Sequence, residues 1–195
     1  MTSLRHNEWT PPTADDLLLD AARDSILAVG WRRSTLTDVA RRAGVSRMTI
    51  YRRWPDMQTL LADLMTREWS GLAAPDPTLP PRRRVADGVT ATVTALRATP
   101  LFAKIVEVDP ELLLPYLLDR RGRTQDTLLA VLGAAVADGQ RDGSVRAGDP
   151  TLLARAVLLA AYGFALSAAT MTGPGVAVDD LDRELGLLVQ GYLAP

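Results

Sequence analysis

The sequence predicts an all-α protein in which a small N-terminal helical unit is joined to a larger C-terminal helical bundle. Apolar residues recur every three or four positions along nearly the whole chain, which is the period of a helix that buries one face. The sequence holds no internal repeat, and no segment of useful length shows the strict alternation of a half-buried strand. The proline-dense segment 74–81 interrupts the helical pattern and marks the clearest boundary in the chain.

The first two helices carry start and stop signals of their own. The first is expected over residues 15–29, and Gly30 ends it. Its buried face comprises Leu18, Ala22, Ile26 and Val29. The segment Thr35-Leu36-Thr37-Asp38 has the spacing of a capping box, which predicts the start of a short second helix that stops at Gly44.

The third and fourth helices are bounded in the same way. Ser46 is expected to cap a helix that runs to about Arg53, because Trp54-Pro55 breaks the pattern there. Asp56 is then expected to cap a longer helix that runs to about Gly71.

Six further helices fit the periodicity beyond the connector, over residues 82–98, 101–107, 110–118, 122–138, 150–171 and 179–193. Asp109-Pro110 and Asp149-Pro150 each combine a capping aspartate with a proline in the first helical position. Gly139 and Asp142-Gly143 are expected to form the turn between two long helices. Pro115 should kink the helix that contains it, which can open space for a ligand.

The composition excludes several classes of protein. Of the 195 residues, 47 % are apolar and 23 % are charged, which is the balance of a soluble globule with a sizeable core. The absence of cysteine excludes a disulfide framework, a thiolate zinc site and a cysteine nucleophile. The single histidine, His6, lies in the N-terminal tail, so histidine triads and paired-histidine metal sites are excluded too. We therefore expect no catalytic residues, no metal and no cofactor.

The charge is distributed unevenly along the chain. Between Trp31 and Trp54 lie seven arginines and a single acid, Asp38, so this window carries +6. Because the net charge of the whole chain is −1, the remaining residues together carry −7. A compact basic block in an otherwise acidic protein is typical of a surface that binds a polyanion.

Two consecutive predicted helices in this window have the residues that two helices need to pack against each other at a steep angle across a short turn. Ala40 supplies a small side chain where the helices cross, and Gly44, four positions later, suits the positive φ of the turn. Ile50, six positions further on, anchors the second helix to the core together with Val45 and Trp54. This joint spacing is that of a helix-turn-helix.

The second of these helices turns a distinct set of side chains toward solvent. At a helical step of about 100° per residue, its outward face comprises Arg47, Met48, Tyr51 and Arg52. An arginine can hydrogen-bond to both O6 and N7 of guanine, and a thioether can contact a thymine methyl group. Phosphate oxygens suit residues at the flanks and at the start of the preceding helix, namely Thr49, Tyr51, Arg53 and either Thr35 or Thr37. The alternative is a surface helix whose arginines only keep it soluble.

Several segments between residues 18 and 64 follow the pattern of one known family: Gly30-Trp31 after the first helix, Thr35–Ala40, Ala43–Ser46, Thr49–Trp54, and Asp56 with Leu60-Leu61. In these segments the chain resembles the N-terminal domain of TetR-family transcriptional regulators. The resemblance implies a three-helix DNA-binding unit that a fourth helix links to a ligand-binding and dimerisation domain. It also implies a homodimeric repressor that a small effector releases from a pseudo-palindromic double-stranded DNA operator.

With this resemblance the chain divides into three parts. Residues 1–14 are expected to be a disordered tail, 15–73 the helix-turn-helix domain with its connecting fourth helix, and 74–195 the effector-binding and dimerisation domain. The expected DNA contacts are Thr35, Thr37, Ser46, Arg47, Met48, Thr49, Tyr51, Arg52 and Arg53. The family often has a phosphate-contacting lysine just after the cap of the fourth helix, where this chain has Met57. We expect Arg52, Arg53 or Thr59 to replace that contact.

The resemblance also implies a dimer interface made from the last two long helices, here residues 152–171 and 181–193. The expected interface residues are Leu152, Ala156, Leu159, Gly163, Leu166, Leu181, Leu185 and Leu188. Small residues such as Ala160 and Gly163 would allow two helices to approach closely. A two-fold dimer should place its paired recognition helices about 34 Å apart, one turn of DNA. The alternative is a core helix of a monomer.

Regulators of this family usually bind a small molecule inside the C-terminal bundle. The candidate lining residues are Phe102, Ile105, Val106, Leu113, Tyr116, Leu132, Phe164 and Ser167. Their mostly apolar character indicates a largely apolar effector, although the same side chains could equally fill a core.

Two other classes of function were weighed against a DNA-binding repressor. A dimeric sensor or adaptor acting through a protein partner would not need the exposed arginine face around Arg47. An enzyme built on a helical bundle would need a Glu-x-x-His motif or a glycine-rich phosphate loop, and the sequence has neither. The apolar stretch that ends near Met171 is about 16 residues long, short of the roughly 20 residues that span a membrane. We therefore expect a cytoplasmic protein without a membrane segment.

Overall fold

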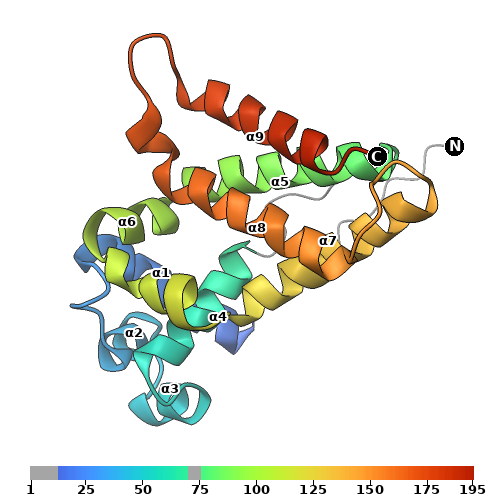
Figure 1. Cartoon of the computed structure of the whole chain (residues 1–195). Coiled ribbons are helices and arrows are strands. Elements are labelled where there is room, and N and C mark those ends of the chain that lie inside the picture. Colours follow the sequence, from blue (N-terminus) through green and yellow to red (C-terminus); the bar gives the residue numbers. More distant parts are fainter. Residues whose placement is uncertain (1–12, 70–75) are drawn as a thin grey trace, which may run out of the picture. The chain divides into compact units, whose positions relative to one another are not determined.

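The computed structural model describes residues 13–69 and 76–195, and every helix or strand element among them is a helix (Figure 1). The predicted all-α class is confirmed. The chain divides into two compact units, one ending at Leu64 and the other beginning at Met65. Most of the predicted tail, the predicted end of the fourth helix near Gly71 and the first residues of the connector lie outside the described residues.

The N-terminal unit contains α1 (Ala14–Val29), α2 (Leu36–Arg42) and α3 (Arg47–Arg53), together with the first turns of α4 (Met57–Trp69). α2 packs against both α1 and α3. The three side-chain caps predicted in this unit are present: Thr35 accepts from the Asp38 amide, Ser46 from the Thr49 amide and Asp56 from the Thr59 amide. Beyond this unit the predicted cap Asp149 is also present, since it accepts from the Thr151 amide, whereas the prediction for Asp109 is wrong, because its side chain makes no capping hydrogen bond.

The buried face of α1 is close to the predicted one. Leu18, Ala22 and Ile26 are buried, as expected. The prediction for Val29 is wrong, because this side chain is largely exposed in the last turn of α1. The helix ends there because Gly30 adopts φ 82°, a conformation outside the helix that glycine adopts without strain.

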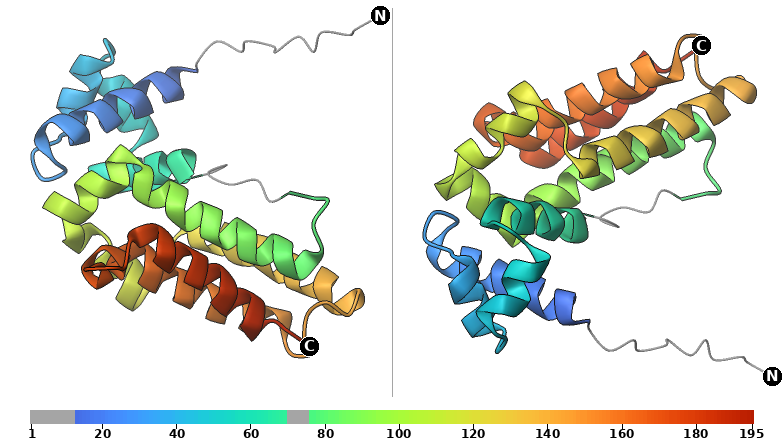
Figure 2. Two further views of the ribbon diagram at one scale, coloured as in Figure 1. Left: turned by 90° about the horizontal axis from the view of Figure 1, so that it is seen from above. Right: turned by 90° about the horizontal axis from the view of Figure 1, so that it is seen from below.

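The C-terminal unit is built from long helices. Its elements are the end of α4, α5 (Pro81–Ala98), α6 (Pro100–Val108), η1 (Pro110–Leu112), η2 (Pro115–Asp119), α7 (Arg123–Arg141), α8 (Pro150–Ser167), η3 (Ala168–Met171) and α9 (Val178–Tyr192). α5 packs against α7, α8 and α9, and Figures 1 and 2 both show α9 running alongside it. The core between these helices is almost entirely aliphatic and includes Val85, Val89, Val136, Val157, Leu185 and Val189.

Two expectations about the helix boundaries of this unit are corrected. Gly139 is not part of a turn, because α7 continues to Arg141 and Gly139 is buried within it. A Cβ atom at Gly139 would lie 2.4 Å from Cγ2 of Val145, so glycine here allows a close approach of the following segment. The predicted helix 110–118 is broken into a 3₁₀ turn and a π turn, each of which begins at a proline that lacks an amide donor.

α8 is longer than the apolar stretch suggested. Helix α8 and η3 together span 22 residues, from Pro150 to Met171, and pass the length and composition test for a membrane span, so the expectation based on length is wrong. Core helices of soluble proteins pass the same test. Leu153, Val157 and Ala161 of α8 are buried in the aliphatic core of the C-terminal unit, so packing within the chain accounts for part of the apolar composition.

One ion pair crosses the core of the C-terminal unit. Nη2 of Arg97, on α5, lies 2.5 Å from both carboxylate oxygens of Asp182 on α9. Nη1 of Arg97 donates to the Phe164 carbonyl at 3.1 Å, and the Thr94 hydroxyl donates to Asp182 at 2.7 Å. These contacts join α5, α8 and α9 through polar groups that are mostly shielded from water.

Candidate functional site

The position of α3 in the N-terminal unit is fixed by a turn, a cap and two buried residues. Gly44 has φ +70°, as the predicted turn requires, and the Ser46 hydroxyl accepts from the Thr49 amide at 3.2 Å. Ile50 and Trp54 are fully buried, and the Trp54 indole donates to the Asp63 carboxylate of α4 at 2.8 Å. α3 therefore has one rotational setting about its axis in this unit.

That setting turns the predicted face of α3 to solvent. Met48 is 83 % exposed, Tyr51 is 50 % exposed, and Arg47 and Arg52 are exposed. Within residues 13–69 and 76–195, neither of these two arginines has a hydrogen bond or an ion pair. The face thus presents two guanidinium groups, a phenol and a thioether that packing does not use, the chemistry that base edges and phosphates require.

The residues expected to contact phosphates differ in how exposed they are and in whether their hydroxyls already have a partner. Thr35 and Ser46 are exposed, but their hydroxyls already act as helix caps. Thr37 and Thr49 are only partly exposed, and the Thr49 hydroxyl lies 2.9 Å from that of Ser46. The structure thus brings these hydroxyls to the two helix N-termini.

Arg53 has a partner that the sequence reasoning missed. Its Nε donates to the Asp15 carboxylate on α1 at 2.8 Å, and its guanidinium lies over the Trp54 ring at 5.7 Å from the centroid. Because Asp15 and Arg53 are 38 positions apart, no local pattern could have indicated this pair. Arg53 therefore reaches a phosphate only by sharing or leaving the Asp15 carboxylate.

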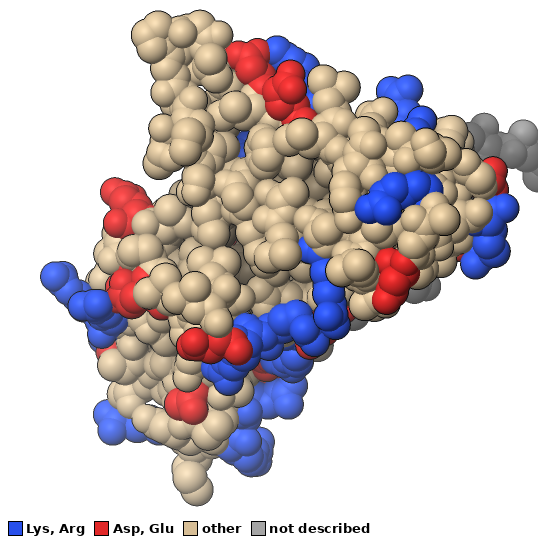
Figure 3. All heavy atoms as spheres, in the orientation of Figure 1, with Lys and Arg blue, Asp and Glu red and all other residues tan. Residues whose placement is uncertain are grey.

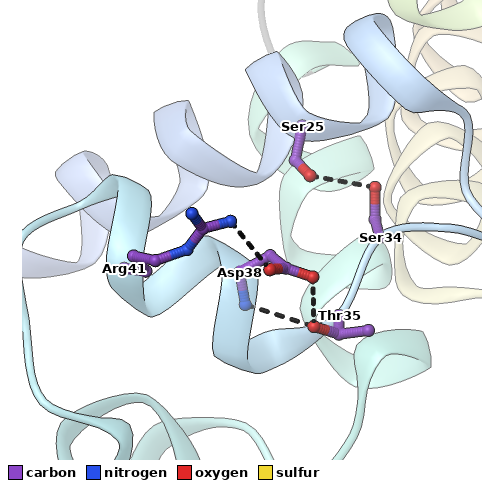
Figure 4. A network of polar contacts seen from close by, with 5 residues as sticks. All are labelled: Ser25, Ser34, Thr35, Asp38 and Arg41. Carbon is purple, nitrogen blue, oxygen red and sulfur yellow. Dashed lines mark hydrogen bonds and ion pairs between the residues drawn. The ribbon is translucent and has the colours of Figure 1, made fainter.

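The start of α2 is held by a small polar network (Figure 4). The Thr35 hydroxyl donates to Asp38 at 2.6 Å, and Arg41 donates to the other carboxylate oxygen at 3.0 Å. These two hydrogen bonds, that from Thr35 first, hold the pKa of Asp38 below its usual value. Nearby, the buried hydroxyls of Ser25 and Ser34 lie 3.1 Å apart and tie α1 to the loop before α2. Asp38 is thus a fixed anion that orients Arg41.

The basic character of the N-terminal unit extends beyond α3. Arg33, Arg41 and Arg42 line a hollow of about 490 Å³ between α1 and α2, in which Asp38 is the one acid. Figure 3 shows basic side chains in the lower part of the view, where Figure 1 places α2 and α3, and the basic residues of these two helices are all arginines. The excess of charge between Trp31 and Trp54 is visible in the sequence, whereas the place of these three arginines around one hollow follows only from the fold.

The predicted interface residues of α8 and α9 fall into three groups by exposure. Leu152, Leu159 and Leu188 are 62 %, 68 % and 55 % exposed, and Gly163 is also exposed. Ala156, Leu166 and Leu181 are partly exposed. Leu185 is fully buried in the core of its own unit, so its side chain is not available to a second copy. The neighbouring Leu187, 61 % exposed, was missed.

Within residues 13–69 and 76–195, two separate hollows each include one of the predicted effector-pocket residues. Leu132 lines an apolar cleft of about 130 Å³ between α5, α7 and α8, together with residues such as Val89, Thr92, Leu128 and Leu158. Tyr116 lines a different hollow. Phe102, Ile105 and Leu113 are buried, with Phe102 edge-on to Trp69, whereas Val106 and Phe164 are partly exposed and Ser167 is exposed. The contribution of α5 to the cleft was missed, because its valines are indistinguishable in sequence from core residues.

Known proteins resemble this chain in its N-terminal unit and over most of its length. Residues 18–64 match a family model described as bacterial regulatory proteins, tetR family. An uncharacterised HTH-type transcriptional regulator of Mycobacterium bovis is 35 % identical over 180 residues, which cover 90 % of this chain and 92 % of that protein.

Solved structures share the fold. A protein of unknown function from Rhodococcus sp. RHA1 has a TM-score of 0.70 at 20 % identity, covering 97 % of this chain and 100 % of that one. FadR from Bacillus subtilis, solved in complex with stearoyl-CoA, has a TM-score of 0.65 at 16 % identity and covers 91 % of this chain and 98 % of its own.

Proposed function

The chain belongs to the TetR family of transcriptional regulators, and from this premise we propose that it is a homodimeric repressor that a small, largely apolar effector releases from a pseudo-palindromic operator. In this proposal residues 15–73 bind DNA, residues 74–195 bind the effector and the second copy, and the protein acts in the cytoplasm. Continuous helix α4 runs from one unit into the other and is the candidate lever between them.

The observation that carries the proposal is the outward face of α3. Ile50 and Trp54 fix the helix from inside, and Arg47, Met48, Tyr51 and Arg52 remain unused by the fold. Surface arginines that only confer solubility need neither a fixed helix setting nor an exposed thioether beside them. We assign Arg47 and Met48 to base edges, and Tyr51 and Arg52 to the flanking backbone.

The proposed dimer rests on the exposed leucines of the last two long helices. A soluble monomer gains nothing by exposing Leu152, Leu159, Leu187 and Leu188 on two neighbouring helices, whereas a two-fold interface would bury them. Leu185, which we had included, is replaced in the proposal by Leu187. The pair of recognition helices would then bind two half-sites about 34 Å apart.

The proposed effector is supported by the apolar cleft between α5, α7 and α8. The structural neighbour FadR was solved with stearoyl-CoA, so this fold can accommodate a molecule with a long apolar part. A ligand that binds one arrangement of the protein better than the other would shift operator affinity by that difference in affinity.

DNA binding is tested by titrating labelled duplexes, selected from a random library, with the full chain at a series of salt concentrations. We expect the logarithm of affinity to fall linearly with the logarithm of salt concentration, by about 0.9 per phosphate neutralised. A protein that acts only through a protein partner would select no duplex sequence and would show no duplex binding at low salt. Either result would overturn the proposal.

The dimer is tested separately by sedimentation of Leu152→Glu. We expect this variant to shift the chain toward monomer and to weaken operator binding, because a carboxylate would lie in the apolar interface. Leu17→Glu is the matched control for self-association, since Leu17 is an exposed leucine on α1. Dimers of undiminished stability in Leu152→Glu would show that this face is not the interface.

A further inference from the structure

The C-terminal unit has a second hollow whose chemistry differs from that of the apolar cleft. It has a volume of about 270 Å³ and lies between the segment 116–121, the start of α7 and one side of α8. Its lining includes two tyrosines, Tyr116 and Tyr162, and three arginines, Arg120, Arg121 and Arg155, against a single acid, Asp119. The hollow is therefore basic, although the chain outside residues 31–54 is acidic overall.

Two of the three arginines retain an uncompensated charge. Arg121 donates to Asp126 at 2.8 Å, so its charge is matched within the chain. Arg120 lies over the Tyr116 ring at 5.7 Å from the centroid, a contact that orients the guanidinium without neutralising it. Arg155, exposed on α8, has no ion pair within the described ranges 13–69 and 76–195. An anion in the hollow would meet both groups.

The wall that carries these arginines is held in place by hydrogen bonds. The Gln125 side chain accepts from the Gly122 amide at 2.6 Å and donates to the Tyr116 carbonyl at 3.0 Å. A Cβ atom at Gly122 would lie 3.1 Å from the Tyr116 ring, so the chain passes directly against that ring. Burial raises the pKa of the Tyr162 phenol, which keeps it a neutral hydrogen-bond donor on the facing helix.

The basic hollow and the apolar cleft share one wall. Leu158 of α8 lines both of them. The cleft offers Val89, Val93 and Leu128 to an apolar chain, and the hollow beyond Leu158 offers cations and phenols to a polar end. The two volumes together reach the lower end of the range typical of ligand sites, roughly 300–1,000 Å³.

We propose that these two spaces form one site for an anionic amphiphile, with its carboxylate or phosphate at Arg120 and Arg155 and its apolar chain in the cleft past Leu158. This inference rests on the proposed function, because it names the chemical class of the effector. A purely apolar effector would leave Arg155 unused, whereas an amphiphile satisfies both the basic hollow and the aliphatic cleft.

The inference is tested by calorimetric titration of the full chain without DNA. The probes are dodecanoate, dodecanoyl-CoA and dodecanol, which have the same carbon chain and differ in the polar end, each used below its aggregation concentration. We expect the two anions to bind roughly tenfold or more tighter than the alcohol. Arg155→Gln should remove most of that preference and leave dodecanol binding unchanged. Arg83→Gln, an exposed arginine of α5 outside both spaces, should change nothing.

A second variant tests the apolar part of the site. Leu158→Trp should weaken all three probes, while its far-ultraviolet dichroism shows whether the helices persist. Equal binding of alcohol and anions, or an undiminished preference in Arg155→Gln, would overturn the inference. Binding of an anion that does not release DNA would leave the site intact but remove effector release from the proposed function. If the protein bound DNA selectively but bound none of the three probes, the inferred site would be overturned and the proposed DNA binding would stand.

Discussion

The two units differ in how far apart in the sequence the residues of their candidate functional surfaces lie. In the N-terminal unit, α2 and α3 each begin at a hydroxyl cap, and the outward side of α3 follows from two buried residues, Ile50 and Trp54. In the C-terminal unit the distinctive polar contact joins Arg97 and Asp182, which are 85 positions apart. A surface made from consecutive residues can thus be found in the sequence, whereas a pocket and an interface depend on long-range packing.

The largest expected loss of stability comes from breaking the ion pair between Arg97 and Asp182 in the C-terminal unit. Arg97→Met leaves the Asp182 carboxylate largely buried without its cation, which should lower the free energy of unfolding by roughly 3–5 kcal/mol. The double variant Arg97→Met, Asp182→Leu should recover most of that loss, because no unpaired charge remains. Chemical denaturation measures both, and a single variant as stable as the parent would show that this pair does not hold the bundle together.

The corresponding test in the N-terminal unit compares two residues of the same helix. Ile50→Ala removes a fully buried side chain and should cost roughly 2–5 kcal/mol. Met48→Ala removes an exposed one and should change stability by less than about 0.5 kcal/mol. Similar losses in the two variants would mean that α3 is not held by its inner face, and the comparison of the units would fail.

A smaller effect distinguishes two glycines, one from each unit. Gly44→Ala places a side chain at φ +70° and should cost about 1–2 kcal/mol, although the space around it is open. Gly133→Ala lies inside α7, also in open space, and should stabilise the protein by about 0.5–1 kcal/mol. Thermal unfolding of both variants checks the signs, and a stabilising Gly44→Ala would remove the conformational reason for glycine in the helix-turn-helix.

The smallest effect concerns acid stability. The pKa of Asp38 is lowered in the folded protein, so its contribution to stability is fully present above the unfolded value near 3.8. That contribution is lost as the pH falls below this value and through the folded pKa. The free energy of unfolding of Asp38→Asn should therefore approach that of the parent as the pH falls from 6 to 2.5. A constant difference across this range would contradict the assignment.

The sequence predicted the N-terminal unit almost completely, because its signals are local. The caps of α2 and α3, the turn glycine and the inward residues of these two helices all lie between Thr35 and Trp54. The Arg53–Asp15 pair, the Ser25–Ser34 contact and the exposure of Val29 required the fold. In the C-terminal unit the existence of the helices followed from periodicity. The cavity linings did not, because Val131, which lines the cleft, and Val136, which lies in the core, look alike in sequence. Leu185 was misplaced for the same reason, since all exposed and buried leucines of α9 occur in one amphipathic run.

The most direct test of the central claim, that α3 reads bases, is the binding preference of Arg47→Ala. Affinity would be measured for the selected operator and for every single base-pair substitution in one half-site, for the parent and for this variant. We predict a loss of preference at one position, roughly 1–3 kcal/mol, with the other positions unchanged, whereas Tyr51→Phe should weaken all sequences alike. If Arg47→Ala weakened every sequence equally, Arg47 would contact only the backbone and the assignment of α3 as the base-reading helix would be contradicted.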